Sequence, residues 1–328
     1  MNLINNGILV ISLDFELIWG VRDKRTIDEY GENILGVRSV VPRLLELFNK
    51  HEIHSTWAIV GFLFFKTYDE LIRGLPTNKP LYLDDRLSPY VHINNIGNNE
   101  QEDPYHYAHS LVKLIASIPY QEIGSHTFSH YYCLERGQDD TAFESDLKAA
   151  IRIAEKYGIT LRSLVFPRNQ YNESYIQICE KLGIESFRGN EDSWIYTPKE
   201  ERRKSIFQRG VRLIDSYLNL SGHHAYDTSK MKNRHPYNIP SSRFLRPYSK
   251  KYKIVEPLKA RRIKADLTYA AKNSLIYHLW WHPHNFGINT DENFAFLEKI
   301  LSHYLYLKDR YGMESLNMGE LASKVERE

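Results

Sequence analysis

The first patterned segment of the chain is a short apolar strand that ends in two acids. Residues 7–13 (GILVISL) are mostly aliphatic and β-branched, and Asp14, Phe15 and Glu16 follow them directly. A strand with apolar residues on both faces is typical of a parallel sheet, and α/β folds place their chemistry at the carboxyl ends of such strands. Side chains two residues apart on a strand point to the same side. We therefore expect both carboxylates to face one pocket, although an acid that caps a helix would give a similar pattern.

Strand-like and helix-like segments alternate through the rest of the chain. Apolar positions follow helical spacing at 37–48, 105–118, 139–157, 175–182 and 294–305, and short apolar runs indicate strands at 55–60, 161–166, 184–187 and 273–281. This order predicts a parallel α/β barrel. Residues 74–104 are rich in Pro, Asn, Asp and Gly and are predicted to be an insertion loop, and residues 222–264 are predicted to be a second insertion.

Length and composition favour one large catalytic domain over residues 1–328. The chain is 42% hydrophobic and 26% charged, as is usual for globular proteins. Residues 1–7 lead into the first strand without the features of a secretion signal, and no window approaches about 18 consecutive apolar residues. We therefore expect no transmembrane segment and a cytoplasmic location, and contact with the inner face of the membrane stays open.

A pair of histidines lies in residues 121–132 (QEIGSHTFSHYY). On a helical turn, the spacing of His126 and His130 would direct two ring nitrogens to one ion at about 2.0–2.1 Å, the distance that zinc requires. Catalytic zinc sites commonly have three protein ligands and an open position for water, so a carboxylate is needed as well. Asp14 and Glu16 are the candidates. Two histidines that cap a helix or form internal hydrogen bonds are the alternative interpretation.

Five segments, in order along the chain, resemble the motifs of the polysaccharide deacetylases, the NodB-homology family of carbohydrate esterases. They are SLDFELIWG at 12–20, EIGSHTFSH at 122–130, FPR at 166–168, DSW at 192–194 and LWWHPH at 279–284. The resemblance implies an irregular (β/α) barrel of the NodB-homology type with loop insertions. The common first motif of the family has two adjacent aspartates, whereas Phe15 takes the second place here. Some branches separate the two acids by one residue, and Asp14-Phe15-Glu16 is similar to that arrangement.

The resemblance also implies which residues bind the metal and which one acts as the base. Glu16, His126 and His130 are expected to hold one divalent ion, with zinc the first choice, and Asp14 is expected to be the catalytic base. Histidine and carboxylate ligands also suit other divalent ions. Whether Asp14 or Glu16 binds the metal stays open.

The remaining motifs imply supporting and acid roles. Arg168 is expected to orient Asp14 and to pair with Asp192, because an arginine can hold a carboxylate in a bidentate pose. His282 is expected to be the general acid, with His284, on the same side two residues later, as the other candidate. The expected substrate contacts are Trp194, Trp281 and His284.

Basic residues are concentrated in residues 230–264. This segment has twelve Lys and Arg and a single acid, Glu256, whereas the net charge of the whole chain is only +2. Such segregation favours an anionic partner. Prolines in the segment disfavour a continuous nucleic-acid recognition helix, so we expect a lipid- or nucleotide-phosphate-linked sugar, or an anionic membrane surface, and no nucleic acid. A solvated basic face without a specific role is the alternative.

Together these observations predict a metal-dependent hydrolase that removes an acetyl group from an N-acetylated sugar, in surface polysaccharide or glycolipid biosynthesis. A protonated His282 would donate a proton to the departing amine, which is otherwise a poor leaving group. Two alternatives stay open. A deformylase or a cyclic-amide hydrolase would use the same site, whereas a catalytically silent glycan-binding module would keep the fold without needing base, acid and metal ligands together.

Overall fold

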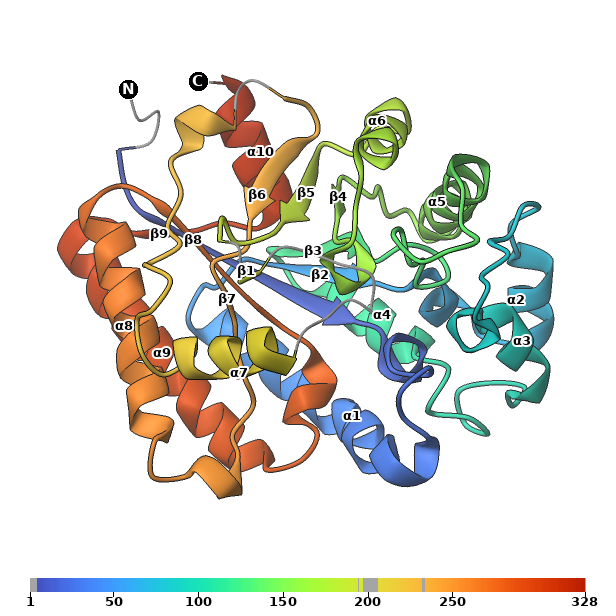
Figure 1. Cartoon of the computed structure of the whole chain (residues 1–328), viewed down its shortest axis with the longest axis horizontal. Coiled ribbons are helices and arrows are strands. Elements are labelled where there is room, and N and C mark those ends of the chain that lie inside the picture. Colours follow the sequence, from blue (N-terminus) through green and yellow to red (C-terminus); the bar gives the residue numbers. More distant parts are fainter. Residues whose placement is uncertain (1–4, 194, 197–205, 232–233, 328) are drawn as a thin grey trace.

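One parallel sheet organises the fold (Figure 1). The computed structural model describes residues 5–193, 195–196, 206–231 and 234–327. The strands are β1 (Ile8–Phe15), β2 (Ser55–Ile59), β3 (Gln121–Ser125), β4 (Ser163–Leu164), β5 (Ser186–Gly189), β6 (Tyr237–Pro240), β7 (Arg243–Phe244), β8 (Ile276–Trp281) and β9 (Glu314–Ser315). Their order is β6-β5-β4-β3-β2-β1-β8-β7, and β9 pairs with the start of β1. Because β1 lies between β2 and β8, both of its edges are hydrogen-bonded and it is buried along its whole length.

The two ends of this strand order meet and close the sheet. β6 and β7 are separated only by Ser241 and Ser242. Ser241 N donates to Gly189 O on β5 at 2.9 Å, and Ser242 N donates to His278 O on β8 at 2.8 Å. One extended segment therefore pairs with β5 through its first half and with β8 through its second half. The predicted irregular (β/α) barrel is confirmed.

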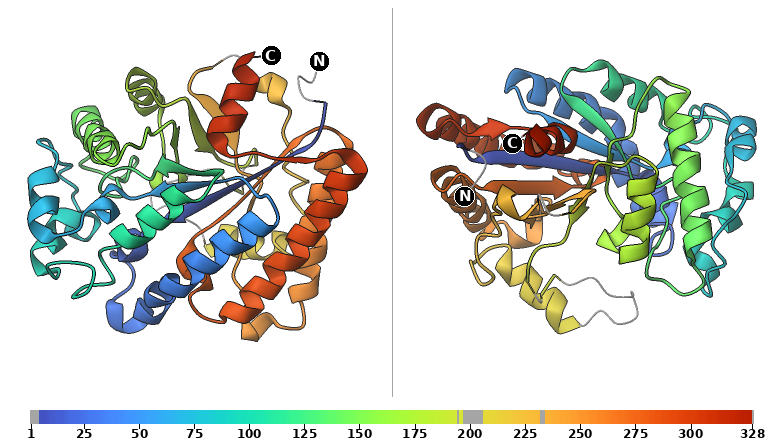
Figure 2. Two further views of the ribbon diagram at one scale, coloured as in Figure 1. Left: turned by 180° about the vertical axis from the view of Figure 1, so that it is seen from behind. Right: turned by 90° about the horizontal axis from the view of Figure 1, so that it is seen from above.

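Helices surround the barrel (Figure 2). They are α1 (Ile27–Lys50), α2 (Tyr68–Gly74), α3 (Pro89–His92), α4 (His109–Ser117), α5 (Asp140–Glu155), α6 (Glu173–Lys181), α7 (Ile206–Asp215), α8 (Glu256–Lys272), α9 (Thr290–Tyr311) and α10 (Met318–Arg327). A capping box begins α1, where Thr26 Oγ1 accepts a hydrogen bond from Glu29 N and the Glu29 carboxylate accepts one from Thr26 N. Within the described ranges, every helix is too short or too polar to cross a membrane.

Alternation along β1 places its side chains in two different environments. The outward side chains pack in the main hydrophobic core, and they are Leu9, Ile11, Leu13 and Phe15. The inward side chains are, in order, Ile8, Val10, Ser12 and Asp14. Ile8 and Val10 pack with Met318, Leu321 and Val325 of α10, so α10 fills the amino-terminal end of the barrel with apolar side chains. The interior is thus apolar at one end and polar at the carboxyl end, where Asp14 lies.

The two predicted insertions have different outcomes. Residues 74–104 form an irregular segment that contains the short helix α3, in keeping with an inserted loop. The prediction that residues 222–264 are an insertion is wrong for much of this segment. It contains β6 and β7, which close the barrel, and the first half of α8. Its strands were missed because they are short and contain Pro240 and the polar residues around it.

Candidate metal and catalytic site

Glu16 follows β1 directly and leads into a short 3-10 turn, residues 17–20. The turn places Gly20 against the Glu16 carboxylate, because a Cβ on Gly20 would lie only 1.9 Å from Glu16 Cδ. Glycine at this position therefore leaves the room that the carboxylate needs. Asp14 and Glu16 are both 3% exposed, so burying two acids here requires cationic or hydrogen-bonding partners for each.

The histidine pair lies in the loop that follows β3. The prediction that His126 and His130 share a helical turn is wrong: the loop is irregular, and Thr127 and His130 have positive φ angles of 61° and 58°. Asp146 of α5 holds this loop, because its carboxylate accepts hydrogen bonds from Phe128 N at 2.7 Å and from the Ser129 hydroxyl. Burial raises the pKa of Asp146 to about 6. The predicted proximity of the two imidazoles is nevertheless correct, with ring centroids 5.0 Å apart.

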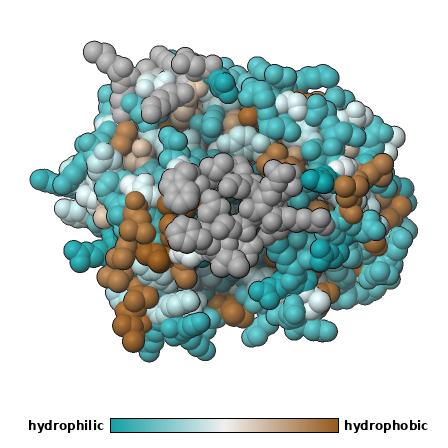
Figure 3. All heavy atoms as spheres, in the orientation of Figure 1, coloured by the Kyte–Doolittle hydropathy of each residue, from teal (hydrophilic) through white to brown (hydrophobic). Residues whose placement is uncertain are grey.

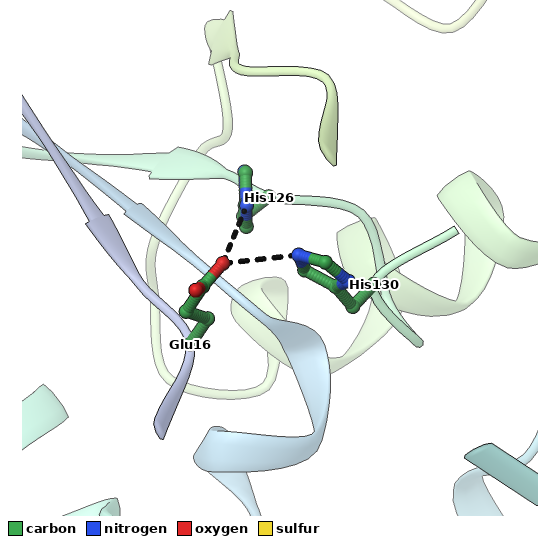
Figure 4. A group of neighbouring side chains, drawn as sticks. All are labelled: Glu16, His126 and His130. Atoms are coloured by element: carbon green, nitrogen blue, oxygen red, sulfur yellow. Dashed lines mark hydrogen bonds and ion pairs between the residues drawn. The ribbon is translucent and has the colours of Figure 1, made fainter. Parts of the chain in front are cut away.

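Glu16, His126 and His130 converge on one point (Figure 4). Glu16 Oε2 lies 3.2 Å from His126 Nε2 and 3.0 Å from His130 Nε2. His126 Nδ1 lies 2.8 Å from the main-chain oxygen of Val165, which can accept only from a protonated Nδ1. The other ring nitrogen of His126, Nε2, faces Glu16, where an ion would bind. Two imidazole nitrogens and one carboxylate oxygen form a donor set that suits zinc and other divalent ions.

The electrostatics of this group fit cation binding. Burial alone would raise the pKa of Glu16, but the charge of His282 and hydrogen bonds from His126 and His130 hold it well below its ordinary value. Burial lowers the pKa of His130 to about 3. The carboxylate is therefore ionised and the imidazole neutral near neutral pH, which are the forms that bind metals.

Asp14 is held by Arg188, which lies on β5. Arg188 Nη1 and Nη2 donate to the two carboxylate oxygens at 2.6 and 2.8 Å, in a bidentate pair that is almost fully buried. Arg188 Nη1 also donates to Ser12 Oγ at 3.0 Å, and the hydroxyl is 2.9 Å from His278 Nε2. Burial raises the pKa of Asp14, but the charge and hydrogen bonds of Arg188, together with the charges of His126 and His282, lower it overall. Asp14 is thus fixed as an anion beside the candidate metal site at Glu16.

The prediction that Arg168 orients Asp14 and pairs with Asp192 is wrong. Arg168 lines the same pocket, but it pairs with Asp23 and, at 3.4 Å, with Glu135, and its guanidinium lies 3.9 Å from the Tyr132 ring centroid. Arg168 has a φ angle of 57°, and the turn in which it lies directs its side chain to Asp23 and Glu135. Asp192 is exposed, and its main-chain N donates to the Tyr226 hydroxyl at 3.2 Å.

The two adjacent tryptophans of β8 point in opposite directions. Trp281, predicted to contact substrate, is fully buried and packs against Phe48 and Phe286, so this prediction is wrong. Trp280 lines the pocket instead, and its ring lies 4.0 Å from the Arg188 guanidinium. Trp194, also predicted to contact substrate, lies outside the described residues.

His282 and His284 both reach the carboxylates. His282 Nε2 lies 3.7 Å from Asp14 Oδ2 and 3.6 Å from Glu16 Oε1, and its side chain is 23% exposed. His284 Nε2 lies 4.0 Å from Glu16 Oε1, its ring stacks on His282, and burial lowers its pKa to about 3. His282 is therefore the more accessible of the two to a bound substrate.

These groups line one cavity of about 500 Å³. Its polar lining includes Asp14, Glu16 and the four histidines 126, 130, 282 and 284. Aromatic residues Tyr30, Phe244 and Trp280 line other parts of the wall, and basic side chains also reach the cavity. The arrangement provides a metal-ligand set, an oriented carboxylate and an accessible imidazole within one pocket, which suits hydrolysis of an acyl group.

The sequence reasoning missed Arg188 and Glu191. Arg188 alternates on β5 with Phe187, which packs in the main core, so a charge on a buried strand was the available signal. Glu191 is buried and lines the cavity, and burial raises its pKa. It lies one residue before Asp192, the acid that the motif match had favoured.

Comparison with known proteins gives a family and a fold. The polysaccharide deacetylase family profile matches residues 26–187, a range that includes both histidines of the candidate metal site but not the two acids. No curated protein sequence matches the chain.

Solved structures share the fold at low sequence identity. A candidate polysaccharide deacetylase from Mycobacterium smegmatis is similar with a TM-score of 0.62 at 12% identity, over 98% of this chain and 91% of that one. A second, from Pseudomonas aeruginosa PAO1, has a TM-score of 0.57 at 12% identity, over 99% and 92%. A GH57-type branching enzyme from Pyrococcus horikoshii has a TM-score of 0.52 at 15% identity, over 97% and 70%. The profile match places residues 26–187 in the polysaccharide deacetylase family, and the solved structures share the barrel fold of the chain.

Proposed function

We propose that the protein is a divalent-metal-dependent deacetylase of an N-acetylated sugar that serves polysaccharide or glycolipid biosynthesis. The observation that carries the proposal is the pair of differently held acids. Glu16 faces two imidazole nitrogens, whereas Asp14 is bound bidentately by Arg188. One acid is thus placed to bind a cation and the other to accept a proton, and these are separate tasks in metal-assisted hydrolysis.

The proposed ligands are Glu16, His126 and His130. A zinc or other divalent ion at this position would polarise the acyl oxygen and lower the pKa of a water molecule. Asp14 accepts a proton from the attacking water, and Arg188 keeps the carboxylate ionised and oriented. The bidentate pair uses two lone pairs of the carboxylate, so a further one on Oδ2 is left to accept the proton.

His282 completes the proposed chemistry by protonating the departing amine. Its Nε2 faces both acids and its side chain reaches the cavity, so a substrate amide placed at Glu16 would lie next to it. Proton transfer by a positioned imidazole contributes typically 10²- to 10⁴-fold to such a reaction. Buried His284 supports the His282 ring by stacking at 5.0 Å between centroids.

We also propose a cytoplasmic location and peripheral contact with an anionic membrane. Exposed apolar side chains gather over α7 and the segment that leads into α8, at the lower left of Figure 3. Ile254 is 94% exposed and Leu218 is 51% exposed, and a ring contact between Tyr217 and Tyr252 holds their two segments together. Exposed lysines at 250, 251 and 253 flank Ile254. An apolar surface edged by lysines is complementary to anionic lipid.

The enzymatic proposal is tested by turnover and metal content measured on the same variants. Acetate release from N-acetylglucosamine oligomers should require a divalent ion and stop with a chelator. Asp14→Asn should abolish turnover and keep the metal, whereas Glu16→Gln should lose the metal. The reverse pattern would exchange the two roles. Formate release from N-formyl sugars, or ring opening of allantoin, without any acetate release would contradict the deacetylase assignment.

The membrane proposal is tested separately by sedimentation with vesicles. Vesicles that contain phosphatidylglycerol should retain the protein at low salt, and vesicles of phosphatidylcholine alone should not. Ile254→Asp should weaken the retention, and Leu83→Asp, at a different exposed apolar position, should not. Equal retention by both vesicle types, or a self-associated protein in place of vesicle binding, would contradict a lipid partner.

A further inference from the structure

The catalytic cavity has a basic wall. Arg212 of α7 and Arg246, two residues after β7, both line the cavity that contains Glu16 and His282. Neither residue belongs to the metal-ligand set or to the Asp14–Arg188 pair. Their position in the same cavity indicates that a ligand reaching the metal-ligand residues would extend to these two guanidinium groups.

Strand pairing directs Arg246 into the cavity. Leu245 N donates to Trp280 O at 2.8 Å, so the pairing with β8 continues beyond Phe244. Leu245 is fully buried in the main core, whereas Phe244 and Arg246, on either side of it, both line the cavity. The main-chain oxygen of Arg246 accepts a hydrogen bond from Lys259 Nζ at 2.9 Å, which holds the backbone at this point.

Arg246 has no acidic partner among the residues that the structure describes. The basic residues around it do: Arg243 pairs with Asp215 and Asp266, and Lys259 pairs with Glu256. Asp215, Asp266 and Glu256 are thus already paired with other basic residues. Acids therefore compensate the positive charge of Arg243 and Lys259, whereas Arg246 has no such partner within the described ranges.

The environment of Arg246 disfavours its charge. Burial lowers the pKa of Arg246, and the charges of Arg212 and Arg243 lower it further. A partly buried guanidinium beside two others is an unfavourable arrangement unless an anion binds there. Arg212 Nε donates to Ile195 O at 2.7 Å, and the Arg212 guanidinium lies 5.4 Å from the Tyr196 ring centroid. Within the described ranges, no acid pairs with this guanidinium.

Aromatic side chains connect the basic wall to the catalytic groups. The Phe244 ring centroid lies 4.7 Å from that of Trp280 and 5.7 Å from that of His282. Such rings can contact the apolar face of a sugar. A sugar lying on Phe244 and Trp280 could therefore present its N-acyl group to Glu16 and a second substituent to Arg246.

We propose that Arg212 and Arg246 form a binding site for an anionic group, a phosphate or a carboxylate, carried by the sugar substrate. Planar guanidinium groups bind both anions through pairs of hydrogen bonds. This inference rests on the proposed function in one respect, which is that the bound molecule is an acylated sugar. The anion site itself depends on the geometry of the two arginines. For the phosphate of the substrate, these two arginines replace the broad basic segment as the proposed point of contact.

The test is calorimetric binding of N-acetylglucosamine 1-phosphate, N-acetylmuramic acid and N-acetylglucosamine to the full-length chain, each with and without a chelator. The wild-type protein should bind at least one charged sugar at least tenfold more tightly than the neutral one, and a chelator should not remove this preference. Arg246→Gln and Arg212→Gln should each abolish most of it. Lys253→Gln, which removes the same charge from an exposed residue outside this cavity, should leave it intact. Arg246→Lys should retain part of it.

Three results would overturn the anion site: equal affinity of the wild-type protein for charged and neutral sugars, unchanged preference in both arginine variants, or an equal loss in Lys253→Gln. Thermal melting of each variant shows that the fold is retained. Which charged sugar binds more tightly distinguishes phosphate from carboxylate. Because binding is measured without turnover, an absence of deacetylation would contradict the proposed function and leave the anion site standing.

Discussion

Replacing Arg188 with methionine should expose the dependence of Asp14 on its buried partner. Arg188 is 1% exposed and binds both oxygens of a carboxylate that is 3% exposed. Removal of one member of a buried ion pair destabilises a protein by about 3–5 kcal/mol, because the other charge stays in a poorly solvated site. The unfolding entropy of a chain of 328 residues is about 0.7 kcal/mol/K, so the Tm should fall by about 4–7 °C.

A double-mutant cycle assigns this loss to the correct pair. Adding Asp14→Asn to Arg188→Met removes the uncompensated charge, so the double variant should be more stable than Arg188→Met alone by about 1 kcal/mol or more. Arg168→Met is the matched control, because Arg168 is also buried and also pairs with acids, but those acids are Asp23 and Glu135. Its effect should add to that of Asp14→Asn without rescue.

Thermal melts and urea titrations of the wild-type protein, the three single variants and the two double variants with Asp14→Asn measure the coupling energy between each arginine and Asp14. Strict additivity between Arg188 and Asp14, or rescue of Arg168→Met by Asp14→Asn, would refute the geometry described here. Turnover of Arg188→Met should also fall steeply, since the carboxylate that accepts the proton loses its fixed orientation. Arg168→Met should reduce turnover less.

Three further predictions concern other parts of the site. His126→Ala should lose the stoichiometric metal, as measured by mass spectrometry. His109→Ala should keep it, although it also removes a histidine that is hydrogen-bonded to a main-chain oxygen. Equal metal content in the two variants would place the ion elsewhere. Trp281→Ala should lower the free energy of unfolding by about 3–5 kcal/mol, and Trp280→Ala should mainly raise KM. A raised KM in Trp281→Ala together with a large loss of stability in Trp280→Ala would contradict the orientations of the two side chains. The pKa of Asp146 is about 6 in the folded chain and 3.8 in a free side chain, so between these pH values the folded chain binds a proton that the unfolded chain has lost. The free energy of unfolding should therefore decline by about 3 kcal/mol as pH rises from about 4 to 6. Asp146→Asn should remove this pH dependence in urea titrations, and an unchanged pH dependence would contradict the raised pKa.

The elements that depend on local pattern could be predicted from the sequence. β1 is recognisable because its apolar run continues to the two acids, and the histidine pair is recognisable by its spacing. These two features predicted that an acid and the histidine pair share one site, and the resemblance to the deacetylases implied Glu16 as the metal ligand. The conformation of the histidine loop did not, because Asp146, from the next helix, fixes it.

The partner of Asp14 could not be predicted from local pattern. Arg168 follows β4 and Arg188 lies on β5, and both are at the carboxyl side of the sheet. Only the side-chain directions distinguish them: Arg188 extends inward from a strand, whereas Arg168 lies in a left-handed turn. The motif match favoured the wrong arginine because it recorded the residue type and not its direction.

The tryptophan error, in contrast, was avoidable. Trp280 is two residues before His282, so strand alternation places these two side chains on one face and Trp281 on the other. The register agrees, since Trp280 pairs with inward-facing Ser12 and Trp281 with outward-facing Leu13. Accepting His282 as a site residue was therefore enough to select Trp280.

The pairing of β1 with β8 has a consequence for protein synthesis. Ile8 lies in the barrel beside Ile276, so β1 must wait for a strand that the ribosome makes much later. Until then the nascent chain carries an apolar strand with an open edge, which is a site for association with other chains. Contacts between residues so distant in sequence also form slowly. We therefore expect the barrel to form only after β8 has left the ribosome, and the unfinished chain to be a client of chaperones.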